Sequence, residues 1–145
     1  MAASVVEQIL ARCKAALLDA TDAADRVERG RPDAVAIDDQ PTLNIRRGTA
    51  DDEPRGDLGG RLMVAWSIEH LVAVDDDWET AADALHMQTH AVLAADTQLA
   101  TLGRGLRCSG TDAEGDSGER VIGRLTARYQ MQVFIRPGDL TRAIN

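Results

Sequence analysis

The sequence predicts an α+β protein in which a mostly antiparallel sheet, with a long β-hairpin, is packed by two helices. Two segments, from Ser4 to about Ala20 and from Trp78 to about Ala95, repeat apolar residues at three- and four-residue spacing, which is typical of helices with one buried face. Two others, 61–74 and 121–135, alternate apolar and polar residues, as half-buried strands do. Since 145 residues suit one hydrophobic core, we expect a single domain over residues 1–145.

The first helix is predicted from its start and from its apolar stripe. Ser4 followed by Glu7 matches a capping box, in which the serine hydroxyl accepts from a free backbone N–H and the glutamate reaches back. The stripe consists of Val5, Val6, Ile9, Leu10, Cys13, Ala16 and Leu17. We expect this stripe to be the buried face.

Residues 21–60 are predicted to be mostly irregular. Three prolines and a glycine-rich run interrupt two short apolar stretches, Ala34 to Ile37 and Leu43 to Ile45, which we interpret as short strands. The polar, acidic stretch 48–60 is predicted to be a mobile loop within the domain.

The strand from Arg61 to Val74 is predicted to lead directly into the second helix. Its inward residues are Leu62, Val64, Trp66, Ile68, His70, Val72 and Val74. It ends at Asp75, Asp76 and Asp77, whose carboxylates are expected to cap the helix, because the helix dipole favours negative charge at its start. The inward stripe of that helix is Trp78, Ala82, Leu85, Thr89, Val92 and Leu93.

The long hairpin is predicted in the last third of the chain. A strand from Leu106 to Ser109 is followed by a polar, mobile tip near 110–119 and then by the alternating segment 121–135. A strand of about fifteen residues would span about 50 Å, which is longer than a core of this size needs. We therefore expect the hairpin to project and to contact another molecule.

Composition excludes several classes of protein. The formal net charge of −8 disfavours passive adhesion to nucleic acid or to an anionic membrane. No segment approaches the about 20 apolar residues of a membrane span, and Met1 to Val6 lack the features of a signal peptide, so a soluble intracellular protein is expected. Cys13 and Cys108 are interpreted as two reduced thiols, since nothing in the sequence brings them together.

The residues that could carry chemistry do not form a catalytic pattern. His86 and His90 have the four-residue spacing of paired zinc ligands, but the intervening residues include no glutamate and no third ligand is evident. Cys108 lies in a predicted strand, without the flanking glycines of a nucleophile elbow. The run 103–105 is too short for a phosphate-binding loop. We therefore predict that the protein is not an enzyme and that it needs no metal and no cofactor.

Arginines at positions 120, 124, 128 and 136 share one face of the last predicted strand, because all four numbers are even. Two interpretations are open. The arginines pair with carboxylates of a neighbouring subunit, or they form a solvated outer face.

The second half of the chain resembles the tail terminator proteins of long-tailed bacteriophages. The similarity lies in ETAADALHMQTHAVLAADTQLATL (residues 79–102), in 106–116 with its Gly110-Thr111-Asp112 turn, and in 118–140 with the Tyr129-Gln-Met-Gln-Val strand and the closing Gly138-Asp139-Leu140. The resemblance is to the lambda-like minor-tail-protein-U type. It implies a virion protein of the tail or neck, assembled in the host cytoplasm.

This resemblance implies a homo-oligomer, a hexameric ring on the last ring of the tail tube. The ring would stop polymerisation of the tube protein, contact a head-completion or connector protein, and let genomic DNA pass without specific binding. Six copies at −8 each would carry about −48 around that channel, and a repulsive wall lets a polyanion slide. Another neck component, such as a head-closure or tail-completion subunit, is the alternative, and a host regulatory module is a third.

Two acidic segments, 51–57 and 112–119, and the arginines beside them are the candidate sites for contacts between subunits or rings, or for the channel lining. They are Asp51, Asp52, Glu53, Arg55, Asp112, Glu114, Asp116, Glu119, Arg120, Arg124 and Arg128.

Overall fold

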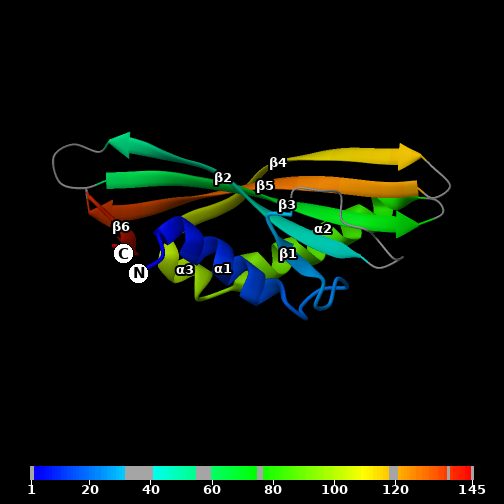
Figure 1. Cartoon of the computed structure of the whole chain (residues 1–145), viewed down its shortest axis with the longest axis horizontal. Helices are drawn as coiled ribbons and strands as arrows, with labels where there is room; N and C mark the ends of the chain where they lie inside the picture. The colour runs from blue at the N-terminus through cyan, green and yellow to red at the C-terminus, as the bar shows by residue number, and fades with distance from the viewer. Residues whose placement is uncertain are drawn as a thin grey trace.

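The computed structural model describes residues 2–31, 41–54, 60–74, 77–117, 121–136 and 138–144. These ranges contain three helices and six strands, whose arrangement can be followed in Figure 1. In chain order they are α1 (Val5–Leu17), β1 (Val27–Arg29), β2 (Thr42–Pro54), β3 (Gly60–Val74), α2 (Trp78–Ala95), α3 (Leu99–Leu102), β4 (Arg104–Ser117), β5 (Val121–Arg136) and β6 (Asp139–Ala143).

The expected fold class, α+β with a mostly antiparallel sheet and two helices, is wrong. The protein is mostly β, with about half of its residues in strands and under a third in helices, and the sheet is curled and mixed. Its strand order is β1-β2-β3-β5-β4, with β6 on β5. β1 pairs with β2 in parallel, through Val27 opposite Leu43, whereas the other pairings are antiparallel.

More residues are in strands than expected, because the backbones of β2 and β4 stay paired with β3 and β5 in segments whose sequence does not alternate apolar and polar residues. Of the expected loop 48–60, residues 48–54 and Gly60 belong to strands, and so do residues 110–117 of the expected tip. There the exposed strands β2 and β4 pair with the half-buried β3 and β5 through backbone hydrogen bonds, which need no apolar side chain. The remainder of both segments, 55–59 and 118–119, lies outside the described residues, as does the predicted strand Ala34–Ile37.

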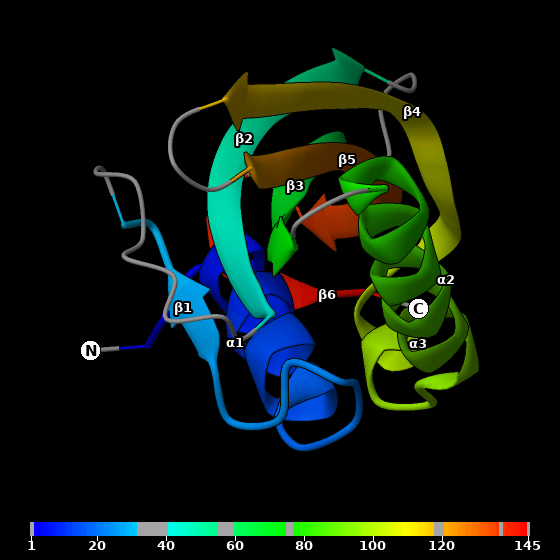
Figure 2. The same cartoon turned by 90° about the vertical axis from the view of Figure 1, so that its right-hand side faces the viewer.

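The sheet is strongly twisted along its length. In Figure 1, β2 is uppermost at the left end of the molecule and β4 is uppermost at the right end. Figure 2 shows the strands curling past one another, with α1 and α2 together against the sheet. The right-handed twist of each strand accumulates over these long elements.

The core lies between the helices and the inward face of the sheet, as the alternation predicts. Leu62, Val64, Trp66, Ile68, His70 and Val72 of β3 are buried, and so are Leu125, Ala127, Tyr129, Met131, Val133 and Ile135 of β5. The Trp66 and Tyr129 rings, opposite each other on β3 and β5, stack with centroids 6.0 Å apart. The helix stripes are largely confirmed as well. Ala82, Leu85, Thr89 and Leu93 are buried on α2.

The predicted helix caps are only partly present. The Ser4 hydroxyl oxygen accepts from the Glu7 N–H at 3.2 Å, but the Glu7 carboxylate pairs with Arg29 and Arg47, so half of the capping box forms. At α2, Asp77 has a left-handed backbone (φ 52°) and its side chain caps no backbone N–H. It accepts from the Thr80 hydroxyl at 2.7 Å instead. Positions 75 and 76 lie outside the described residues.

Trp78, the first residue of α2, fixes the helix on the sheet by lying against two glycines. Gly115 of β4 and Gly123 of β5 are opposite each other in the sheet. A Cβ at Gly123 would come within 2.1 Å of the Trp78 ring, and one at Gly115 within 2.7 Å. The Trp78 indole therefore fits here only because positions 115 and 123 carry no side chain.

Replacing Gly123 with alanine should displace Trp78 and lower the free energy of unfolding by about 1–3 kcal/mol, as overpacking does. The measurement is urea unfolding of the variant. In a Trp78→Ala background the same substitution should cost much less. An equal cost in both backgrounds would show that the indole is not the obstacle.

Candidate functional site

The two acidic segments lie at opposite ends of the sheet. β3 and β5 pair without interruption from Gly60 opposite Ile135 to Val74 opposite Val121. The end of β2 that carries Asp51 and Asp52 is therefore separated from the β4–β5 turn by most of a strand of about 50 Å. The segments cannot form one site, and each can contact a different neighbour.

The structure places six of the eleven candidate residues with their side chains. Asp51, Asp52, Asp112, Glu114 and Arg128 are exposed, and Arg124 is partly exposed. Glu53 and Asp116 belong to β2 and β4 by their backbone, opposite Arg61 and Ile122, but their side chains lie outside the described part. Arg55, Glu119 and Arg120 lie outside the described residues altogether.

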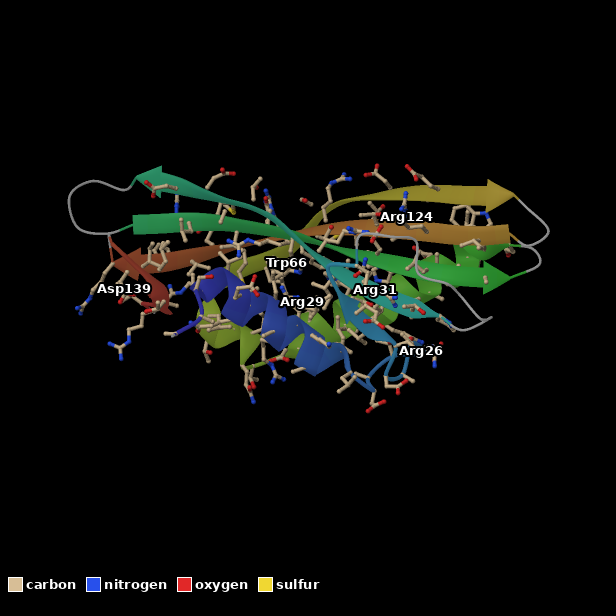
Figure 3. All side chains as sticks on the ribbon, viewed as in Figure 1. Arg26, Arg29, Arg31, Trp66, Arg124 and Asp139 are labelled. Carbon is tan, nitrogen blue, oxygen red and sulfur yellow. The ribbon has the colours of Figure 1, made fainter. Side chains whose placement is uncertain are left out.

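Arginine and carboxylate side chains form a ladder across four strands on the face of the sheet away from the helices. Glu69 of β3 accepts from Arg46 of β2 at 2.5 Å and from Arg124 of β5 at 3.3 Å. Arg124 also pairs with Glu114 of β4, which lies directly opposite it. Figure 3 shows Arg124 over the right-hand half of the sheet.

Glu69 is the centre of this ladder, because its carboxylate is almost completely buried. Its side chain is 8% exposed, and the Asn44 amide donates to the same oxygen as Arg46, at 2.8 Å. A buried carboxylate is tolerated only when it is paired and hydrogen-bonded. Nothing in the sequence indicated this role for Glu69, because its partners come from two other strands, β2 and β5.

Arg124 and Arg128 pair within their own chain. Arg128 contacts Asp112, which is displaced diagonally on β4, and Arg124 contacts Glu69 and Glu114. Arg136 is exposed at the end of β5. Neither sequence interpretation foresaw these pairs within the sheet, whose partners come from β3 and β4.

A second polar cluster lies between the sheet and α2, with His70, Thr89 and Tyr129 buried and His86 and His90 half-buried. The Tyr129 hydroxyl lies 3.0 Å from His86 Nε2 and 3.2 Å from His90 Nδ1. His70 contacts the Leu125 carbonyl oxygen at 3.1 Å and the Thr89 hydroxyl at 3.0 Å. Cys108 lies beside His86 at 4.0 Å. These contacts join α2 to three strands, and the sequence signal for them is the inward position of His70 and Tyr129.

Burial controls the protonation of this cluster. Desolvation, helped by the nearby His86, lowers the pKa of His70 to about 4. Desolvation and then His90 lower the pKa of His86, and burial raises the pKa of Tyr129. At neutral pH His70 and His86 are therefore neutral and can share hydrogen bonds with hydroxyl groups.

Three further observations concern metal binding, the cysteines and membrane spans. Within the described ranges, no group of three or more His, Cys, Asp or Glu side chains is arranged to hold a metal ion. Cys13 and Cys108 are both free, as expected. Among the helices in the described part of the chain, none is long and apolar enough to cross a membrane.

No protein-family model matches the chain, and no curated protein matches it.

Glu69→Gln should lower the free energy of unfolding by about 1–2 kcal/mol, because two arginines lose the charge of a buried partner. Urea unfolding at neutral pH measures this loss. Glu114→Gln is the matched control. It removes one charge from an exposed pair and should cost less than about 0.5 kcal/mol. Equal losses in the two variants would contradict the central position of Glu69.

Stability should fall as the pH is lowered from about 6.5 toward about 4. In this window unfolded His70 binds a proton, whereas folded His70 stays neutral because its pKa is about 4, so acid favours the unfolded state. The loss attributable to His70 is on the order of 3 kcal/mol at most.

The check is the free energy of unfolding measured across this pH range for the wild type and for His70→Gln. The variant should show a shallower dependence, to which His86 still contributes. If the two slopes are the same, His70 is not the group responsible.

Proposed function

We propose that this chain is a structural subunit of a phage tail, a terminator that assembles into a ring, caps the tail tube and joins it to a head-completion protein. The observation that supports this role best is the pair of hairpins that extend to opposite ends of one sheet. A subunit that lies between two different neighbours along an axis needs a contact surface at each end.

The length of the strands supports the same role. β3 and β5 have 15 and 16 residues, whereas strands in globular proteins usually have about 3–10. Toward the left end in Figure 1, the β2–β3 hairpin reaches past the helices. Strand length beyond what the core requires is expected where the sheet itself is a contact surface.

Sequence and charge support the more specific assignment. The resemblance to tail terminators falls within residues 79–140. These residues form α2, α3, β4, β5 and the start of β6, and so include the β4–β5 hairpin. The chain has a formal net charge of −8, and Asp51, Asp52, Asp112 and Glu114 are exposed. A ring of such subunits would repel DNA from its wall.

Mass photometry of the purified protein, alone and with short tail tubes, tests the proposal. We expect a particle of about six times 15.6 kDa that binds tube ends, and tubes that stop growing once it is added. Heat-unfolded protein is the control for non-specific blocking. A ring that ignores tubes but binds the head-side connector would indicate another neck component. A monomer that binds neither would overturn the proposal.

A further inference from the structure

The sheet has two long edges that are exposed within one copy of the chain. On β2, the neighbour β1 covers only Leu43 to Ile45, and the last contact on that side is the Gly30 N–H to the Ile45 carbonyl oxygen at 2.8 Å. From Arg46 onward, β2 has no further partner strand on that side among the described residues. β4 is the other edge, and most of its residues are exposed. Such edges are templates for pairing with another chain.

The directions of the two edges suit pairing between copies. β2 is antiparallel to β3, β3 to β5, and β5 to β4, so β2 and β4 run in opposite directions. If a second copy lay beside the first in the same orientation, β4 of the second copy would be next to β2 of the first. The two strands would run antiparallel. This is the arrangement that an antiparallel ladder requires.

The charges on these edges match in sign and in spacing. Arg46 and Asp51 of β2 lie opposite Ser67 and Met63 of β3, so both are on the face away from the helices. Arg107 and Asp112 of β4 lie opposite Gln130 and Thr126 of β5, on the same face. In each pair the arginine precedes the acid by five residues, and each interval includes one extra, bulged residue. One antiparallel register therefore places both arginines opposite acids.

Two of these four charges have no ionic partner among the described residues of their own copy. Asp51 is exposed and makes no ion pair or side-chain hydrogen bond within the described part of the chain. The Arg107 guanidinium donates there only to Gln130, with the Gln130 amide turned so that its oxygen faces the arginine. Arg46 and Asp112 already contact Glu69 and Arg128. The contact between Asp51 and Arg107 is thus the one that a neighbouring copy would add.

We propose that β2 of one copy pairs with β4 of the next, with Asp51 opposite Arg107 and Arg46 opposite Asp112. This inference deepens the proposed function and rests on its premise that copies of the chain assemble. The two surfaces differ, so the contact is head-to-tail and continues until a ring closes.

The pairing is also compatible with a closed ring in its geometry. Within one copy, Arg46 lies at the level of Ser67 of β3, whereas Asp112 lies at the level of Glu69, two residues further along β3. Pairing Arg46 of one copy with Asp112 of the next therefore aligns Ser67 of the first with Glu69 of the second. Each copy would be displaced by about 7 Å along the strands relative to the last. A constant displacement of this kind tilts the strands against the ring axis, as in closed barrels.

Charge reversal tests the register. Asp51→Arg and Arg107→Asp should each raise the subunit concentration needed for assembly by about fivefold, because like charges would then be directly opposite. The double variant D51R/R107D should assemble like the wild type, and so should an equal mixture of the two single variants. Asp52→Arg is the matched control, since Asp52 lies opposite Leu62 and so on the other face. Circular dichroism checks that every variant is folded.

The outcomes separate this inference from the proposed function. If the wild type forms rings that cap tubes and both single variants do so equally well, or if the double variant does not recover, the edge pairing is wrong and the terminator role stands. If charge reversal breaks assembly and the double variant restores it, but rings ignore tubes, the pairing is right and the terminator role is wrong. A wild type that stays monomeric with and without tubes overturns both.

Discussion

The continuous pairing of β3 with β5 is the interaction on which the rest of the structure depends. Fifteen consecutive residues of each strand are opposite one another, with no bulge between them. One face of this pair carries the apolar residues that α1 and α2 cover, and the other carries Glu69 and Arg124. Because the pair spans the whole length of the molecule, it also sets the distance between the two hairpin ends.

The two faces of the sheet are stabilised by different interactions. On the helix side, apolar burial is combined with a few polar contacts, of which those of Tyr129 with His86 and His90 join α2 to the sheet. On the other side, the buried carboxylate of Glu69 receives donors from β2 and β5. Such a network fixes the register of the strands more than it adds to net stability, because the carboxylate and the guanidinium both lose hydration water when they pair. Strands that curl as strongly as these need their register fixed on both faces.

The outer strands differ from the central ones in what their side chains can do. β5 alternates between buried and less buried positions, and β3 does so from Arg61 to Ile68 and is buried on both faces from there to Val72, whereas β4 from Thr111 to Gly115 is exposed at every position. Such a segment contributes little to its own core, although its backbone pairs fully with β5. Its pattern of charges is therefore free to serve contacts with other molecules. In the proposed assembly, the centre of the sheet would give the fold and its edges would give the interface.

The sequence by itself determined the elements whose patterns are local. The helix at 78–95, the inward residues of β3 and β5, and the Ser4 cap follow from periods of 3.6 and 2 residues and from one hydroxyl at a helix start. Tertiary structure alone decided how far β2 and β4 extend, that β1 joins in parallel, and which arginine meets which acid. Backbone pairing and ion pairs depend on partners distant in the chain. The apolar stretches indicate strands at 43–45 and 106–109, but no local pattern in 48–54 or 110–117 shows that backbone pairing with β3 and β5 continues there.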